Sequence, residues 1–323
     1  MQLHTYVLKR LVGLIPTLLL ITLCTFMIIK IAPGDPILMF MDTMEADQME
    51  DLERLRERMG LHDPLHVQYW RWMTNFFTGD FGQSIAARRP VLELILERLP
   101  ATLLLTAAAL VFSLVISIPV GIISAVRQYS LVDNLVTTFA FFGIAMPNFW
   151  LGLLMIWLFS IYLGVLPSGG MGTIGVSGGW AGFLDTGRHL ILPMIVLGTA
   201  SMAGFTRYMR SSVLEVLNED YIRTAKAKGL SERVVLYKHA LKNAFIPMAT
   251  LLGFRLRMFI SGSLITEQIF AWPGLGWYTW HSVNRRDYPV MMGILTFAAC
   301  LTLIGNLLAD VSYAFLDPQI RYS

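Results

Sequence analysis

The chain has 323 residues, of which 55% are hydrophobic and only 15% are charged, and its mean hydropathy is +0.59. Soluble domains carry about a quarter charged residues, so this composition speaks against a soluble protein. The formal net charge of +3 is too small to indicate a nucleic-acid partner. Charges are crowded between a few long apolar blocks, which is the pattern that a lipid bilayer imposes.

Six of these blocks are long enough to cross a membrane. A helix needs about 20 mostly apolar residues to do so, because its backbone polar groups must be satisfied internally. The predicted spans cover about residues 11–29, 99–126, 134–163, 189–206, 243–266 and 288–309, and the glycine-rich remainder up to residue 184 is predicted to be a loop. Prolines within or beside the spans predict kinks: Pro16, Pro119, Pro147, Pro193 and Pro247.

The distribution of basic residues predicts the orientation. The loop between the fourth and fifth spans holds eight of them: Arg207, Arg210, Arg223, Lys226, Lys228, Arg233, Lys238 and Lys242. Lys9 and Arg10 precede the first span and fall on the same side in a six-span chain. Both termini are therefore predicted to be cytoplasmic. A cleaved signal peptide is the alternative for the N-terminus, but no small-x-small site follows the apolar run.

Three segments follow from this topology: residues 1–32 with the first span, an external insertion at 33–98, and a core domain at 99–323 with five spans and a cytoplasmic loop at about 209–245. In the insertion, apolar spacing predicts a helix over 42–58 that stops at Gly60. Residues 67–77 are rich in aromatic side chains. We favour an interfacial aromatic belt for them over a docking surface for an external partner. Residues 90–99 are predicted to be an amphipathic lead-in to the second span.

Two patterns of soluble enzymes occur in the glycine-rich loop, but without the strands that give them meaning. Residues 170–175 match G-x-G-x-x-G, and residues 175–179 match G-x-S-x-G. A phosphate-binding G-x-x-x-x-G-K-[ST] motif and an H-E-x-x-H motif are absent from the sequence, and the histidines are scattered. Cys24 and Cys300 both lie in apolar blocks. We therefore predict no catalytic residue, metal site or cofactor in this chain, and any use of nucleotide energy would need another subunit.

The loop between the fourth and fifth spans contains a clearly signalled short helix. Glu219 and Asp220 open it, Lys226 and Lys228 come late, and Gly229 closes it. A further helix is predicted from Ser231, as its N-cap, toward residue 247. Such a short charged helix could contact a cytoplasmic partner mechanically or lie on anionic lipid, and the residues alone favour neither.

The same segment, Glu219 to Gly229, resembles the cytoplasmic loop of ABC-importer permeases. The closest likeness is to the dipeptide/oligopeptide/nickel family, in the subunit with the long first external loop. Further segments agree in order: 33–36, 79–84, 146–150, 270–276, 286–290 and 317–318. The general loop motif has Glu-Ala-Ala where this chain has Arg223, Thr224 and Ala225. The role of that glutamate is therefore not transferred.

The resemblance implies a type I ABC-importer permease fold in the bacterial inner membrane. It implies a homologous second permease, two cytoplasmic ATPases that hold ATP and Mg²⁺, an external solute-binding protein and membrane lipid as partners, with no nucleic acid. The implied function is import of di- or oligopeptides by alternating access. Nickel chelates, glutathione, haem and charged oligosaccharides are alternative cargoes. A membrane-embedded enzyme is the disfavoured alternative class.

Two sets of residues carry this hypothesis. Contact with an ATPase is assigned to the loop helix: Glu219, Asp220, Tyr221, Arg223, Thr224, Ala225, Lys228 and Gly229. A translocation pathway is assigned to Arg255, Arg257, Met146, Asn148, Glu267 and Asp310. Intramembrane arginines are costly and mark functional positions. Arg255 could bind a substrate carboxylate bidentately. Alternatively, it could pair with an acid such as Asp310 or with the partner subunit, and this pairing is favoured.

Overall fold

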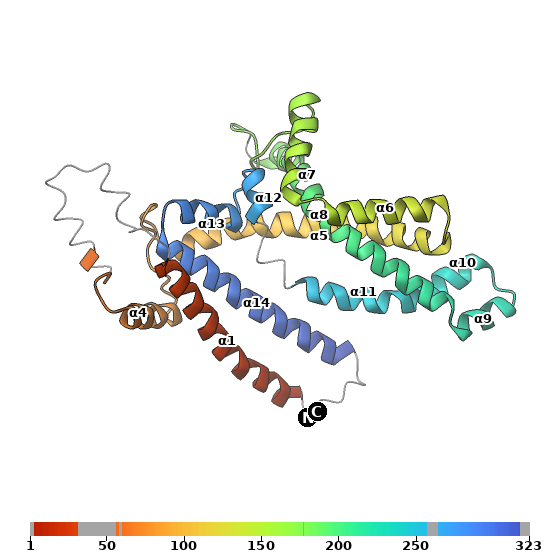
Figure 1. Cartoon of the computed structure of the whole chain (residues 1–323), viewed down its shortest axis with the longest axis horizontal. Coiled ribbons are helices and arrows are strands. Elements are labelled where there is room, and N and C mark those ends of the chain that lie inside the picture. The colour runs from red at the N-terminus through yellow and green to blue at the C-terminus, as the bar shows by residue number, and fades with distance from the viewer. Residues whose placement is uncertain (1–2, 32–55, 58–59, 177, 257–263, 317–323) are drawn as a thin grey trace. The chain divides into compact units, whose positions relative to one another are not determined.

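The computed structural model describes residues 3–31, 56–57, 60–176, 178–256 and 264–316. This described part of the chain is helical, with one isolated β-bridge between Gln83 and Pro90, which confirms the predicted all-α class. The elements, shown in Figure 1, are α1 (Leu3–Ile31), α4 (Leu65–Phe77), α5 (Val91–Val126), α6 (Leu131–Ala145), α7 (Asn148–Met155), the π-helix η2 (Ile156–Tyr162), α8 (Gly179–Leu217), α9 (Asp220–Ala227), α10 (Glu232–Val234), the π-helix η3 (Val235–Ala240), α11 (Leu241–Leu256), α12 (Leu264–Ile269), α13 (Leu275–Asn284) and α14 (Tyr288–Leu316).

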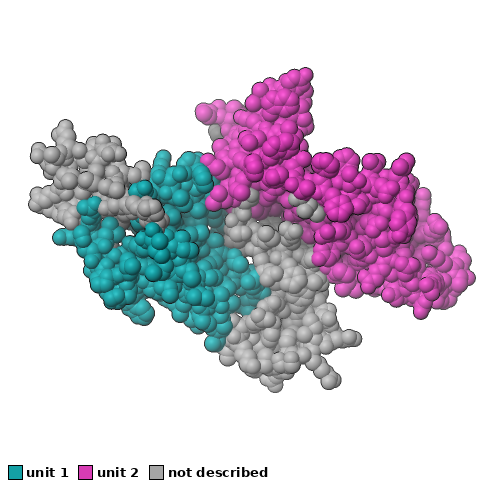
Figure 2. All heavy atoms as spheres, in the orientation of Figure 1, with its two compact units in different colours: residues 1–100, 274–323 teal, residues 101–273 magenta. Residues whose placement is uncertain are grey.

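These helices form two compact units, which Figure 2 colours separately. Unit 1 comprises Met1–Pro100 with Gly274–Ser323, and unit 2 comprises Ala101–Pro273. The first turns of helix α5 belong to unit 1, and the rest of the helix belongs to unit 2. The segments predicted above, with limits at residues 32 and 98, follow membrane topology instead and stay a prediction.

In unit 1, α1 packs along α14, and α4 covers one end of the pair. Phe26 of α1 and Met292 of α14 are buried together, with Tyr69 and Trp72 of α4 against them. The Tyr69 hydroxyl also lies 3.0 Å from the Thr22 hydroxyl. Part of the aromatic run at 67–77 is therefore a packing face of unit 1. Trp70 and Phe77 are exposed, and whether they form an interfacial belt or a docking surface stays a prediction.

A buried carboxylate holds the segment before α5 in place within unit 1. Asp287 is 2% exposed and accepts hydrogen bonds from the Ser84 hydroxyl (2.5 Å) and from the backbone N–H groups of Ile85 (3.2 Å) and Ala86 (3.1 Å). The pKa of Tyr278 is raised, mainly by burial and to a lesser extent by the nearby Asp287 carboxylate. The two motifs at 79–84 and 286–290 thus form one hydrogen-bonded structure.

Four described helices are long and apolar enough to cross a membrane: Val12–Ile31, Val91–Val126, Gly179–Leu217 and Tyr288–Leu307. Residues 131–143 and 148–162 provide a fifth if they count as one bent span. The predicted fifth span, at 243–266, includes residues 257–263, which lie outside the described part of the chain. The number of six spans therefore stays a prediction.

At two of the predicted spans the helices differ from a single helix of the predicted length. The third span is not one helix, because the chain bends by 102° between α6 and α7. The bend falls at Met146 and Pro147, where a proline favours an extended backbone in the residue before it. The fourth span was predicted to end near residue 206, but α8 runs from Gly179 to Leu217. The helix continues through charged residues such as Arg207 and Arg210, so it extends beyond the apolar part of its sequence.

Helix α8 is the centre of unit 2, with α6, α7 and α11 packed against it. Helix α5 also approaches it closely at Gly198. A β-carbon at this position would lie 2.7 Å from the Phe112 ring and 3.0 Å from the Ala109 carbonyl oxygen. The Ser113 hydroxyl donates to the Gly198 carbonyl oxygen at 2.8 Å. Small residues and hydroxyl groups of this kind let membrane helices approach each other closely.

Candidate functional site

The candidate site begins where α8 ends and the short helix α9 starts. Glu219 is the N-cap of α9 by its extended backbone (φ −68°, ψ 148°), and its side chain makes no capping hydrogen bond. Asp220 in the first turn and Lys226 in the last complement the helix dipole, as the sequence predicts. The pair Asp220–Arg223 (3.4 Å) is fully on the surface and contributes little stability.

The end of α9 is fixed by Gly229. Its backbone has φ +75°, its N–H donates to the Lys226 carbonyl oxygen (2.9 Å), and the Leu230 N–H donates to that of Ala225 (3.4 Å). These two bonds form the Schellman motif that commonly closes helices. Because left-handed backbone strains any residue with a β-carbon, a glycine suits this position best. The predicted helix stop is confirmed.

One face of α9 is buried and the other is free for contact. Ile222 and Ala225 lie against Val235 and Ala240 of η3. Glu219, Asp220, Arg223, Thr224 and Lys228 are exposed, and Tyr221 is 40% exposed. The Asn243 amide donates to the Tyr221 hydroxyl at 2.7 Å, which ties α9 to α11. Of the eight residues assigned to ATPase contact, Ala225 faces the core and can only position the others.

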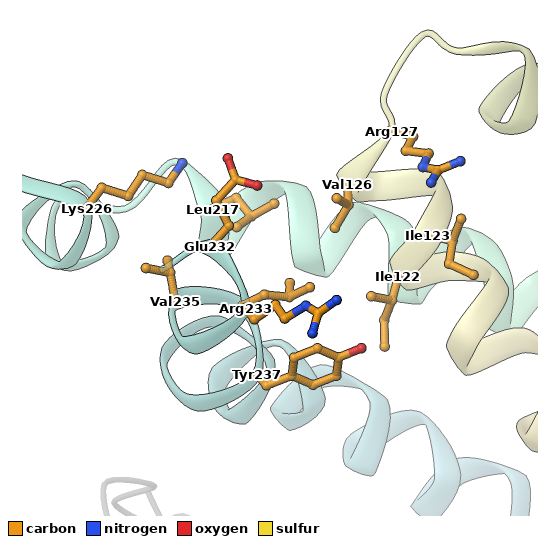
Figure 3. Close-up of a pocket in the computed structure, with 11 residues that line it drawn as sticks. Ile122, Ile123, Val126, Arg127, Leu217, Lys226, Glu232, Arg233, Val235 and Tyr237 are labelled. Atoms are coloured by element: carbon orange, nitrogen blue, oxygen red, sulfur yellow. The ribbon is translucent and has the colours of Figure 1, made fainter. Parts of the chain in front are cut away.

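The predicted second helix continues without a break through α10, η3 and α11 to Leu256, past Pro247. Ser231 is its N-cap residue, although its side chain makes no capping bond. A cavity of about 640 Å³ lies between this helix, α9 and the end of α5, and Figure 3 shows residues that line it. Sequence reasoning missed this cavity, since its walls come from segments about a hundred residues apart.

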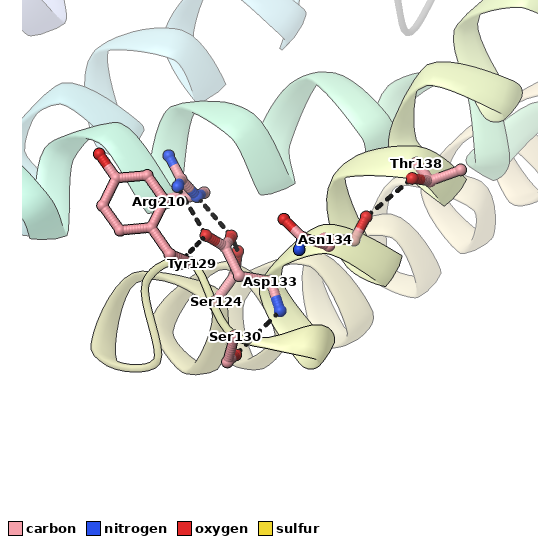
Figure 4. A network of polar contacts seen from close by, with 7 residues as sticks. All are labelled: Ser124, Tyr129, Ser130, Asp133, Asn134, Thr138 and Arg210. Atoms are coloured by element: carbon pink, nitrogen blue, oxygen red, sulfur yellow. Dashed lines mark hydrogen bonds and ion pairs between the residues drawn. The ribbon is translucent and has the colours of Figure 1, made fainter.

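An ion pair between a buried carboxylate and a half-buried arginine joins α6 to α8 near the same end of unit 2 (Figure 4). Asp133 is 2% exposed, and Arg210 donates to its two oxygens at 2.7 and 2.8 Å. The Ser124 hydroxyl and the Tyr129 N–H (2.9 Å) also donate to this carboxylate. Such bidentate, charge-assisted bonds are the strong class of hydrogen bond. The network therefore fixes the loop between α5 and α6 to the part of α8 that leads into α9.

Sequence reasoning also missed this ion pair. One local signal was present, because Ser130 and Asp133 have the spacing of a helix start, and the Ser130 side chain accepts from the Asp133 N–H (3.3 Å). The partner Arg210 lies 77 residues further on. Nothing in the local pattern pairs the two.

The residues assigned to the translocation pathway are described only in part. Met146 packs against the buried cluster that contains Leu192 and Phe270, and Asn148, half-buried, is the first residue of α7. Glu267 is fully buried in α12 and accepts from the Thr102 hydroxyl at 2.9 Å. Arg257 lies outside the described residues, and the side chains of Arg255 and Asp310 are not described either. The pathway assignment stays a prediction.

Together these features define a class: a multi-pass helical membrane protein with a rigid, exposed helix in one of its loops. Residues 117–322 match the family described as the binding-protein-dependent transport system inner membrane component, and residues 3–106 match that family's N-terminal component. The chain belongs to this family and is an inner-membrane protein.

Relatives cover almost the whole chain. The oligopeptide transport system permease protein AppB of Bacillus subtilis (strain 168) is 48% identical over 318 residues, which are 98% of this chain and 99% of AppB. The glutathione transport system permease protein GsiC of Salmonella paratyphi A (strain ATCC 9150 / SARB42) is 43% identical with the same coverage. The inward-facing MetNI methionine ABC transporter shares the fold. A chain of it aligns with a TM-score of 0.52 at 18% identity, covering 69% of this chain and 96% of that chain.

Proposed function

We propose that this chain is one of two permease subunits of an ABC importer and that it moves small peptides across the inner membrane by alternating access. It carries out no covalent chemistry itself. ATP and Mg²⁺ are held by two cytoplasmic ATPases, and an external solute-binding protein delivers the cargo. Six spans with both termini in the cytoplasm complete the proposal. The relatives support it, since their names include an oligopeptide and a glutathione permease.

The observation that carries the mechanism is the construction of α9. Its exposed face offers charged and polar side chains, while Ile222 and Ala225 are packed against η3 and Tyr221 is bonded to Asn243. A force on the exposed face is therefore passed to α8 and α11 and not lost in a flexible loop. We propose that closure of the ATPases pushes α9 and thereby rotates the helices that α8 and α11 belong to, as a two-state switch of rigid elements.

Replacing Gly229 tests this role. Gly229→Val places a β-branched residue at φ +75°, where the backbone conformation costs about 1–2 kcal/mol, so the end of α9 should reorient. We expect normal insertion into the membrane, loss of peptide uptake, and loss of substrate-stimulated ATP hydrolysis. The assays are uptake of labelled peptide by cells and ATPase activity of the purified transporter.

Gly164→Val is the matched control. Gly164 also has a positive φ (+63°) and, like Gly229, no atom within 4 Å of an added β-carbon, but it lies in a loop that the proposal places outside. This variant should import peptide at close to the normal rate. Normal uptake by Gly229→Val, or equal loss in both variants, would contradict the coupling role.

A separate proposal concerns acidic cargo. Arginine binds carboxylates bidentately, so Arg255 would favour acidic peptides if it faces the pathway. Arg255→Gln should then reduce uptake of acidic peptides about tenfold or more, with little change for neutral peptides, since charge-assisted bonds contribute about 1.5–3 kcal/mol. Competition uptake assays with matched neutral and acidic dipeptides measure this ratio. Equal loss for both classes would favour pairing with an acid of the protein.

A further inference from the structure

The cavity beside α9 has an apolar wall at the end of a membrane helix. Ile122, Ile123 and Val126 of α5 line it, and Ile123 and Val126 are 47% and 52% exposed. Helix α5 is one of the candidate spans, and it ends at Val126. Because Arg127 is the first charged residue after this apolar run, the cavity lies where α5 leaves the hydrocarbon region. Apolar side chains exposed at this depth are suited to contact with an acyl chain.

The charged part of the lining is mostly cationic. Arg127, Lys226 and Arg233 contribute three positive charges, against one carboxylate from Glu232. Within the described residues, none of these three cations forms an ion pair or a side-chain hydrogen bond. Figure 3 shows the Arg233 guanidinium and the Tyr237 hydroxyl pointing toward Ile122. The Arg233 guanidinium, which has no acid of the described residues bound to it, therefore lies beside the apolar wall, and Arg127 and Lys226 line the same cavity.

We infer that this cavity binds an anionic phospholipid, with its phosphate between Arg127 and Arg233 and one acyl chain along Ile123 and Val126. Three observations lead to this class of ligand. Basic pockets between membrane helices at the cytoplasmic side suit anionic headgroups. Tyr237, which is 68% exposed, is a residue type enriched at the level of the headgroups. The excess of positive charge favours an anionic lipid over a zwitterionic one.

Bound there, the lipid would contact α5, α9 and η3 at once. It would therefore connect the end of a membrane span to the packed face of the loop helix. Lipid binding in this cavity does not depend on which solute is transported, and the experiment below measures bound lipid, not uptake.

The test is lipid retention by the full chain, purified in mild detergent with the subunits that accompany it. The protein is equilibrated with equal amounts of phosphatidylglycerol and phosphatidylcholine, and bound lipids are counted by native mass spectrometry. We expect a preferentially retained phosphatidylglycerol. The double variant Arg127→Gln/Arg233→Gln should bind it about thirty-fold more weakly, from about 1 kcal/mol for each cation near the headgroups.

The matched control is Lys238→Gln/Lys242→Gln. It removes the same charge from exposed positions of the same region outside the cavity, so retention should stay unchanged. Equal weakening in both double variants would overturn the inference, because the attraction would then be one of general surface charge. Equal retention of the two lipids would also overturn it.

A protein occupant is the remaining outcome. Ile123→Cys, in a chain whose Cys24 and Cys300 are replaced by serine, would report on it. Cross-linking of this position to an ATPase or to a second permease in the purified complex would show that a subunit fills the cavity. That result would overturn the lipid site. Absence of such a cross-link, with retained phosphatidylglycerol, would support it.

Discussion

At the scale of single residues, two buried aspartates hold loops against helices. Asp287 in unit 1 and Asp133 in unit 2 are each 2% exposed, and both accept several hydrogen bonds. A buried carboxylate that lost these donors would be costly, so each one specifies the conformation of the chain around it. Asp287 fixes the segment before α5. Asp133 fixes the loop between α5 and α6.

The contribution of the Asp133–Arg210 ion pair to the stability of the protein should be measurable. Asp133→Asn leaves Arg210 without its carboxylate and replaces one of the two acceptor oxygens of this network by an NH2 group, so we expect a loss of about 3 kcal/mol, the lower end for a broken buried pair. The Arg210 side chain is 25% exposed, and for this reason the expected loss is at the lower end of the range for buried pairs. The measurement is the midpoint of thermal unfolding of the purified chain in detergent.

Asp220→Asn is the control for that measurement. It makes the same chemical change in a fully exposed pair at 3.4 Å, which should contribute less than about 1 kcal/mol. A midpoint for Asp133→Asn no lower than that of Asp220→Asn would show that the buried network contributes no more stability than the exposed pair.

What the sequence predicted at this scale was local. The acids that open α9 and the glycine that ends it can be found by reading consecutive residues, and the structure confirms that ending. Asp133 and Arg210 are 77 residues apart, and Ser84 and Asp287 are 203 apart. Those pairs depend on how helices pack, for which one sequence has no direct signal.

At the scale of elements, apolar blocks predicted where helices lie but not how far they extend. Helix α8 continues to Leu217, because packing against α11 and η3 supports its charged end. The third block is divided at Pro147, which the sequence flagged as a kink but not as a bend of 102°. The aromatic run in α4 was interpreted from composition alone, which did not predict that Tyr69 and Trp72 pack against α1 and α14.

The close approach of α5 to α8 gives a second stability test. Gly198→Val would place a branched side chain 2.7 Å from the Phe112 ring, so the helices must separate. Overpacking of this kind costs about 1–3 kcal/mol, and a lower unfolding midpoint in detergent would report it.

Gly187→Val is the corresponding control in the same helix. No atom lies within 4 Å of an added β-carbon there, so the change should have little effect on the midpoint. Equal midpoints for the two variants would mean that Gly198 does not set the distance between α5 and α8.

At the scale of the whole molecule, the family is established over almost the entire chain, while the topology rests on the distribution of basic residues. Every mechanistic proposal above needs α9 in the compartment that contains ATP. The predicted fifth span falls partly on residues 257–263, outside the described part of the chain, so the side of the membrane on which α9 lies must be measured.

Labelling of single cysteines in intact cells makes this measurement most directly. Cys24 and Cys300 are replaced by serine, and a cysteine is placed at an exposed position of α9 (Thr224→Cys) or of the predicted outer loop (Ser168→Cys). A membrane-impermeant maleimide should label Ser168→Cys at once and Thr224→Cys only after the cells are permeabilised. Labelling of Thr224→Cys in intact cells would place α9 outside and contradict its proposed role as the contact for the ATPases.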